Sequence, residues 1–124
     1  MLSRISGATK NYAWGSKKLV PDFFGLAESS ELIAEIWFGT HPLGESKSFA
    51  DNQRLSENLG KRLSFLVKFL SAERALSIQV HPNSDQAKVG FDLEQSQAIP
   101  ISDPKRNYKD ASHKPEALIA LTSF

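Results

Sequence analysis

The chain has 124 residues, enough for one domain with a buried core and too few for a second of ordinary size. Lys and Arg number 15 against 14 Asp and Glu, without a block of like charge, so neither nucleic acid nor a membrane surface is an expected partner. Cysteine is absent, which excludes disulfide scaffolds, thiol catalysis and zinc sites built from thiolates.

No segment has the length of a membrane span or the pattern of a signal peptide. The longest unbroken aliphatic run, residues 117–121, is far too short to cross a bilayer. The first seven residues lack the apolar core of a signal peptide. The sequence therefore predicts a single cytoplasmic domain over residues 1–124.

The first half of the chain predicts one loop, one strand and one short helix. Residues 7–21 mix turn formers with aromatic side chains, which is typical of an irregular loop. Residues 31–42 alternate in part between apolar and polar side chains, which indicates a strand that ends at Gly39. Residues 50–62 carry leucines spaced by four positions and indicate a short helix that ends at Gly60.

Three strands are predicted in the second half. Residues 64–70 form a mostly apolar run, which is typical of a buried strand. Residues 75–80 form a second strand, which Pro82 stops because proline has no N–H for the ladder. Residues 115–124 are expected to form a third, apolar strand.

The main helix is predicted between the second and third of these strands. Asn83 or Ser84 can cap its first turn, and the pattern continues to about Gln97. A long polar loop over residues 100–112 is expected to follow it.

The segment before this helix has the sharpest chemical signal. Successive side chains of a strand point to opposite faces, so Ser77, Gln79 and His81 share one polar face. This face either meets water, as the wet side of an ordinary amphipathic strand, or lines a pocket. An amide oxygen and an imidazole two residues apart suit a metal such as zinc. The spacing alone leaves both readings open.

The sequence HKPE at residues 113–116 is the second candidate. It is either a polar loop edge that leads into a strand, or a source of Glu116 as a carboxylate ligand beside Gln79 and His81. In the second case Lys114 lies near a dication, which disfavours its charged form and leaves an amine that can accept a proton.

Five blocks of sequence occur in the order in which they occur in one enzyme family. They are YAWGS at residues 12–16, AEIWFGTHP at 34–42, FLVK at 65–68, LSIQVHP at 76–82 and RNYKD through HKPE at 106–116. In these blocks, and over essentially its whole length, the chain resembles the amino-terminal part of the type I phosphomannose isomerases.

The resemblance implies a zinc enzyme on a cupin-like jelly roll that interconverts mannose 6-phosphate and fructose 6-phosphate. Zinc suits this reaction because it stabilises the oxyanion that develops when a proton moves between C1 and C2. By the same resemblance the zinc ligands are Gln79, His81 and Glu116, and Lys114 is a candidate for proton transfer. Residues implied near the sugar phosphate substrate are Trp14, Glu35, Lys68 and Ser77.

The family also has parts that the five blocks do not contain: a fourth zinc ligand, which is a histidine, an active-site arginine and much of the phosphate-binding surface. The expected fold is therefore mainly β with short helices, an incomplete cupin-like jelly roll with little isomerase activity of its own. The alternative is a non-enzymatic cupin-like module that binds a metal or a partner. An apolar strand at residues 117–124 is expected to leave an unpaired sheet edge, which favours self-association.

Overall fold

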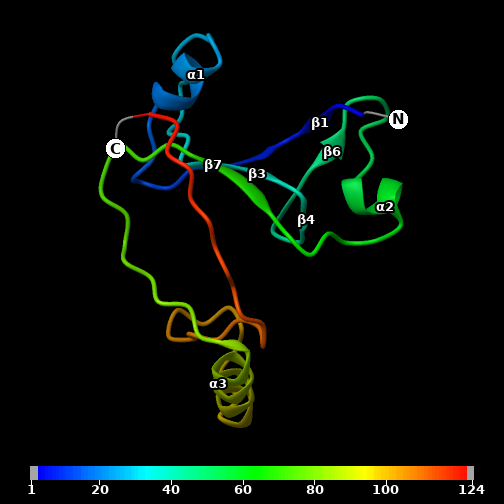
Figure 1. The fold of residues 1–124 in the computed structure, drawn as a ribbon, viewed down its shortest axis with the longest axis vertical. Helices are drawn as coiled ribbons and strands as arrows, with labels where there is room; N and C mark the ends of the chain where they lie inside the picture. Colours follow the sequence, from blue (N-terminus) through cyan, green and yellow to red (C-terminus); the bar gives the residue numbers. More distant parts are fainter. Residues whose placement is uncertain (1–2, 123–124) are drawn as a thin grey trace. The chain divides into compact units, whose positions relative to one another are not determined.

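The structure, a computed structural model, describes residues 3–122. The chain divides into two compact units, Met1–Ser77 and Ile78–Phe124. Figure 1 shows the strands in the first unit and the longest helix, α3 (Ser84–Ser96), in the second. The expectation of one partial, cupin-like domain over residues 1–124 stays a prediction, because two compact units can belong to one domain or to two.

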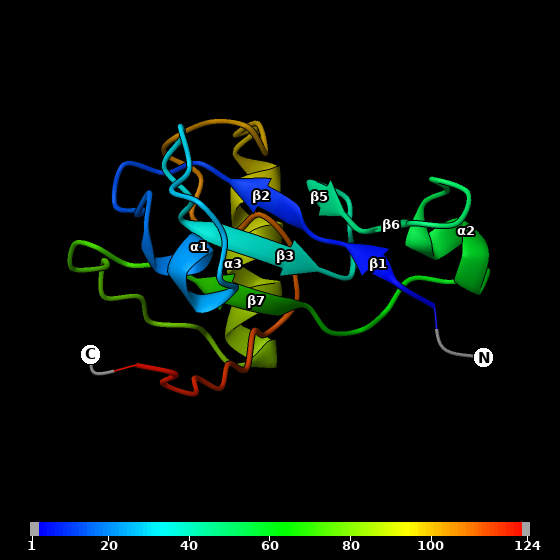
Figure 2. The same ribbon diagram turned by 90° about the horizontal axis from the view of Figure 1, so that it is seen from above.

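Short antiparallel strands provide most of the regular structure of the first unit. A three-stranded sheet has the order β2 (Ala8–Lys10), β3 (Glu35–Phe38) and β7 (Val67–Leu70), which Figure 2 shows side by side. Two further pairs join β1 (Ile5–Ser6) to β6 (Lys47–Ser48) and β4 (Thr40–His41) to β5 (Gly44–Glu45). The helices of this unit are α1 (Leu19–Phe23) and α2 (Leu55–Leu59). The predicted class, mainly β with short helices, is confirmed.

Aromatic rings cover one face of the central sheet. Phe69 of β7 contacts Phe23 and Phe24 at the end of α1, with ring centroids 6.2 and 5.7 Å apart. Phe38 of β3 lies against the same Phe69 ring at 5.9 Å, edge to face. Such pairs stabilise packing beyond the area that they bury, so this cluster fixes α1 on the sheet.

Both helices that the sequence predicts are present, although α2 occupies only part of the predicted residues 50–62. α2 ends at Gly60, whose φ of 63° is a left-handed conformation that favours glycine. At the start of α3 the Gln86 N–H donates to Asn83 Oδ1 at 2.9 Å, and the Asn83 N–H donates to Gln86 Oε1 at 3.1 Å. This is a reciprocal cap. Among residues 3–122, no helix is both long and apolar enough to cross a membrane.

Two predicted strands are wrong. Residues 75–80 and the described part of 115–124, which is 115–122, form no strand, and residues 123–124 lie outside the described chain. Ile78 is 97% exposed and Val80 is 91% exposed. A strand needs a hydrogen-bonded neighbour, and neither segment pairs with another strand in the part that the structure describes. A pattern of apolar residues in the sequence shows which side chains could share a face, but it does not show whether a partner strand exists.

Two other expectations need correction. Residues 7–21, predicted to be an irregular loop, contain β2 and the start of α1, because β2 gains its hydrogen bonds from β3, far away in the sequence. Within residues 64–70 the strand is confined to β7, and most of its residues are exposed rather than buried. β7 has β3 as its one neighbour in the described sheet, so it is an edge strand.

Candidate metal centre

The second unit contains an open pocket at the start of α3. Its volume is about 740 Å³, and Gln79 and His81, two of the predicted zinc ligands, lie in its wall. The full lining consists of Gln79, Val80, His81, Pro82, Gln86, Arg106, Asn107 and Tyr108. The polar members of the QVHP sequence therefore meet a pocket, although the segment that carries them is not a strand.

The third predicted ligand, Glu116, approaches His81. Glu116 Oε1 lies 3.4 Å from His81 Nε2. Two ligands of one tetrahedral zinc ion, each about 2.05 Å from the metal, stand about 3.3 Å apart. The two side chains therefore have the separation that a shared zinc ion requires, and an imidazole nitrogen with a carboxylate oxygen is a donor set that zinc accepts.

Among the described residues, no further histidine or carboxylate joins His81 and Glu116 to form a larger metal-binding group. In residues 3–122 no three or more His, Asp or Glu side chains gather where they could hold a metal ion. The amide of Gln79, which lines the same pocket as His81, is the remaining predicted donor of the chain. His81 and Glu116 thus fit two positions of a zinc site, and Gln79 as a third ligand stays a prediction.

Lys114, the candidate for proton transfer, is directed at a carboxylate. Its Nζ lies 3.0 Å from Asp110 Oδ2, and both side chains are about half exposed. Lys114 is not one of the described residues that line the pocket. The role of Lys114 in proton transfer stays a prediction.

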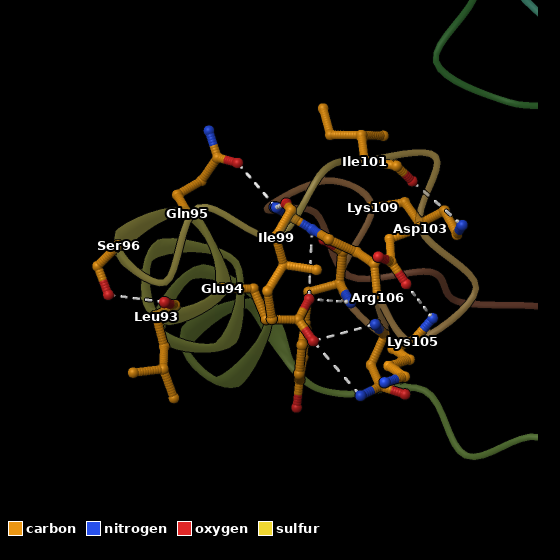
Figure 3. A network of polar contacts seen from close by, with 12 residues as sticks. Leu93, Glu94, Gln95, Ser96, Ile99, Ile101, Asp103, Lys105, Arg106 and Lys109 are labelled. Atoms are coloured by element: carbon orange, nitrogen blue, oxygen red, sulfur yellow. Dashed lines mark hydrogen bonds and ion pairs between the residues drawn. The ribbon is translucent and has the colours of Figure 1, made fainter.

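A buried polar network joins the pocket wall to α3, and sequence reasoning missed it. Figure 3 shows the Glu94 carboxylate and the Arg106 side chain directed toward one another, and Arg106 Nε lies 3.3 Å from Glu94 Oε2. The backbone N–H groups of Asn107 and Tyr108 donate to the same carboxylate at 3.0 and 2.8 Å. Burial alone would raise the pKa of Glu94, but these hydrogen bonds and the Arg106 charge hold this pKa below its ordinary value.

Two of the predicted substrate residues come together in the first unit. Lys68 Nζ lies 3.8 Å from Glu35 Oε2, to which the indole N–H of Trp37 also donates. The ammonium groups of Lys10 and Lys68 lie 4.6 and 4.9 Å from the centre of the Trp37 ring. All four side chains share one face of the central sheet through the register of β2, β3 and β7. Lys10 could not be found from sequence, because only this register brings it beside Trp37.

The other two predicted substrate residues have different surroundings. The Trp14 carbonyl accepts a hydrogen bond from the Glu73 N–H at 3.0 Å, and its ring centroid lies 5.8 Å from that of Tyr12. Ser77, the last residue of the first unit, is exposed. The substrate roles of Trp14, Glu35, Lys68 and Ser77 stay predictions.

Known proteins place this arrangement in a family. Residues 2–124 match the family described as phosphomannose isomerase type I, catalytic domain. A crystal structure of a mannose 6-phosphate isomerase bound with zinc and yttrium superposes with a TM-score of 0.77 at 34% identity. The superposition covers 90% of this chain and 33% of that one. The fold class is therefore cupin-like, as in these structural neighbours. The chain belongs to the type I phosphomannose isomerases.

The matches to curated relatives cover almost the whole of this chain but only about a third of each relative. The mannose-6-phosphate isomerase of Escherichia coli is 39% identical over 142 residues, covering 99% of this chain and 36% of the relative. The Bos taurus enzyme is 35% identical and covers 97% and 32%. A Salmonella typhimurium enzyme bound to substrate and a zinc atom has a TM-score of 0.75 at 33% identity, covering 90% of this chain and 33% of that one. The chain thus spans about a third of these relatives' length.

Proposed function

We propose that this chain contributes the zinc-binding part of a mannose-6-phosphate isomerase, which interconverts mannose 6-phosphate and fructose 6-phosphate. The observation that carries the proposal is the 3.4 Å approach of His81 Nε2 and Glu116 Oε1 beside the pocket. Two donors at the spacing of a shared zinc ion, in a chain of this family, favour a metal centre over a chance surface pair. Zinc-bound isomerases among the structural neighbours support the choice of metal.

The residues divide the work of the reaction between them. Gln79, His81 and Glu116 would hold the ion, which supplies a Lewis acid for the sugar oxygens when it is bound. Isomerisation moves a proton between C1 and C2, so a side chain must hold that proton in transit. Lys114 would do so at Nζ once it leaves Asp110.

Lys68 and Glu35 of the first unit are proposed substrate residues. Lys68 offers an ammonium group whose partner, Glu35, is a buried carboxylate 3.8 Å away, so this ammonium is held in one region of the sheet. A positioned ammonium suits a phosphate or hydroxyl oxygen of a sugar phosphate. Trp14 and Ser77 are further candidates for contact with the sugar.

The chain alone is expected to turn over little substrate and to associate with itself. Binding energy from the phosphate orients the reacting carbons, and beyond the single ammonium of Lys68 the sequence shows no recognised cluster that anchors this group. The sheet edge expected at residues 117–124 is not formed in the described part, because residues 117–122 are not a strand. Exposed apolar side chains at Ile78, Val80 and Ile119 would favour contact with a second copy instead. Location in the cytoplasm stays a prediction.

Metal analysis with a matched pair of variants tests the proposal. Wild type and His41→Ala, which changes a histidine of the first unit, are expected to bind one zinc ion per chain. His81→Ala is expected to lose it, because one of two strong donors is gone. Zinc stoichiometry that His81→Ala leaves unchanged would contradict the proposal.

An isomerase assay with and without zinc then separates the enzyme from the binding module. Activity that appears only with zinc, after a separately expressed carboxy-terminal piece of the family is added, supports the enzyme. Zinc binding that never leads to turnover, even with this piece present, favours the non-enzymatic module.

A further inference from the structure

The segment that carries Glu116 and Lys114 has no regular structure of its own. After α3 ends, the described chain forms neither helix nor strand, and every described residue from 109 onward is exposed. A segment without a ladder or a packed face takes its conformation from the points where it is attached. The attachments of residues 106–116 therefore decide where Glu116 stands.

The first attachment is the pair of Glu94 and Arg106. The Arg106 side chain is fully buried and donates from Nε to the Tyr108 carbonyl at 2.8 Å and from Nη1 to Gln95 Oε1 at 2.8 Å. Its guanidinium carbon also lies 4.9 Å from the centre of the Phe91 ring. The start of the segment is thus held against α3 by one buried cation and one buried carboxylate.

A close contact strengthens this attachment. The ring of Tyr108 lies over Gly90 of α3, where an added Cβ would come within 2.4 Å of the tyrosine Cζ. Glycine is costly inside a helix, so its presence allows the ring to lie against the helix backbone. These contacts therefore hold residues 106–108 in one position against α3.

The second attachment lies at the other end of α3. His113 Nδ1 is 2.9 Å from Ser84 Oγ in the first turn of the helix. Between the two attachments Asp110 turns the chain, because its Oδ1 accepts from the Ser112 N–H at 2.9 Å. The segment is thus fastened at both ends of one rigid helix, and Glu116 follows three residues after the second attachment.

We propose that the Glu94–Arg106 pair positions Glu116 for the metal centre. By fixing residues 106–108 on α3, the pair sets the path of the segment and with it the 3.4 Å approach of Glu116 to His81. In this proposal Glu94 and Arg106 act on the metal centre through Glu116 and are positioning residues. The inference rests on the proposed function, because both require that the site binds zinc.

Stability alone does not favour this solution. Replacing a buried ion pair by apolar side chains is often neutral or stabilising, because both charges lose their hydration. Among the described residues Arg106 Nη2 is moreover buried without a hydrogen-bond partner, which costs free energy. Hydrogen bonds and ion pairs have a preferred geometry, so this pair can fix the path of the loop, whereas apolar packing is not directional.

Zinc affinity measured against a competing chelator dye tests the proposal. Glu94→Gln keeps the shape of the side chain and removes its charge, and zinc affinity is expected to fall about 10- to 100-fold, as for other partners of metal ligands. Asp92→Asn is the matched control, since Asp92 lies on the same helix in an exposed pair with Lys88. Its zinc affinity is expected to equal that of wild type.

The nuclear Overhauser contact between the His81 ring and the Glu116 side chain gives a readout that needs no zinc. This contact is expected in the metal-free wild type and in Asp92→Asn, and is expected to be lost in Glu94→Gln. Ser84→Ala, an exposed change that weakens the second attachment, is expected to reduce it. If Glu94→Gln fails to fold, Arg106→Lys, which keeps the charge and loses the forked geometry, is judged by the same contact.

The outcomes separate this inference from the proposed function. A wild type that binds no zinc contradicts the proposed function, and the His81–Glu116 contact then decides the inference alone. A folded Glu94→Gln that keeps both this contact and wild-type zinc affinity would overturn the inference.

Discussion

The two units hold their candidate functional side chains by different means. In the first, Glu35 and Lys68 stand on neighbouring strands whose backbone hydrogen bonds fix which residues face each other. In the second, Glu116 stands on an irregular segment that side chains fasten to α3. A ladder distributes its support over many backbone bonds, whereas the fastened segment depends on two attachments. Single substitutions and protonation should therefore disturb the candidate metal centre more selectively than the sheet.

The largest expected effect is a backbone change in the first unit. Gly15 lies so close to the residues before β3 that an added Cβ would come within 2.6 Å of the Ala34 nitrogen and 2.7 Å of the Ile33 carbonyl. Because these atoms are backbone, they cannot swing aside, and Gly15→Ala is expected to cost about 3 kcal/mol in the free energy of unfolding. Urea unfolding followed by tryptophan fluorescence measures this cost.

Gly60→Ala is the matched control for that change. Gly60 has a φ of 63° and nothing within 4 Å of an added Cβ, so only the left-handed backbone is penalised, by about 1 kcal/mol. If Gly15→Ala costs no more than Gly60→Ala, the sheet is less rigid than the comparison of the units requires.

A smaller and more local effect is expected on acidification. Because the folded pKa of Glu94 lies below its ordinary value of 4.5, the stability from this carboxylate is full above that value and is lost as pH falls through the folded pKa. The amide resonances of Asn107 and Tyr108, which donate to Glu94, are therefore expected to shift with a midpoint below 4.5.

The control for acidification lies in the first unit. Hydrogen bonds from the Ser56 hydroxyl and from the Ser56 N–H, which lies 2.7 Å from Glu45 Oε1, lower the pKa of Glu45. Glu45→Gln should remove the acid shift of the Ser56 amide and leave those of Asn107 and Tyr108 intact, and Glu94→Gln should do the reverse. Acid shifts at residues 107 and 108 that persist in Glu94→Gln would show that another group fastens the segment.

Local signals explain what the sequence could predict of the fold. The end of α2 at Gly60 and the cap of α3 at Asn83 depend on residues within a few positions of each other, and both are confirmed. β2 was missed and residues 75–80 were wrongly assigned because strands depend on a distant partner. Alternation along one segment carries no information about such a partner.

The candidate site shows the same division. The motif at residues 79–81 and the one at 113–116 could be read in sequence, and the structure brings His81 and Glu116 together. The pair of Glu94 and Arg106 could not be read, because a helix end and a loop separate two side chains that no spacing rule connects. What holds a ligand in place is less visible in sequence than the ligand itself.

X-ray absorption spectroscopy of the zinc-loaded chain tests the central claim most directly, since the claim is that His81 and Glu116 share one zinc ion. The expected spectrum shows one imidazole and otherwise oxygen ligands, at about 2.0–2.2 Å from the metal. His81→Ala should abolish the imidazole signal. A spectrum with no imidazole in the wild type, or with one that His81→Ala leaves in place, would contradict the account.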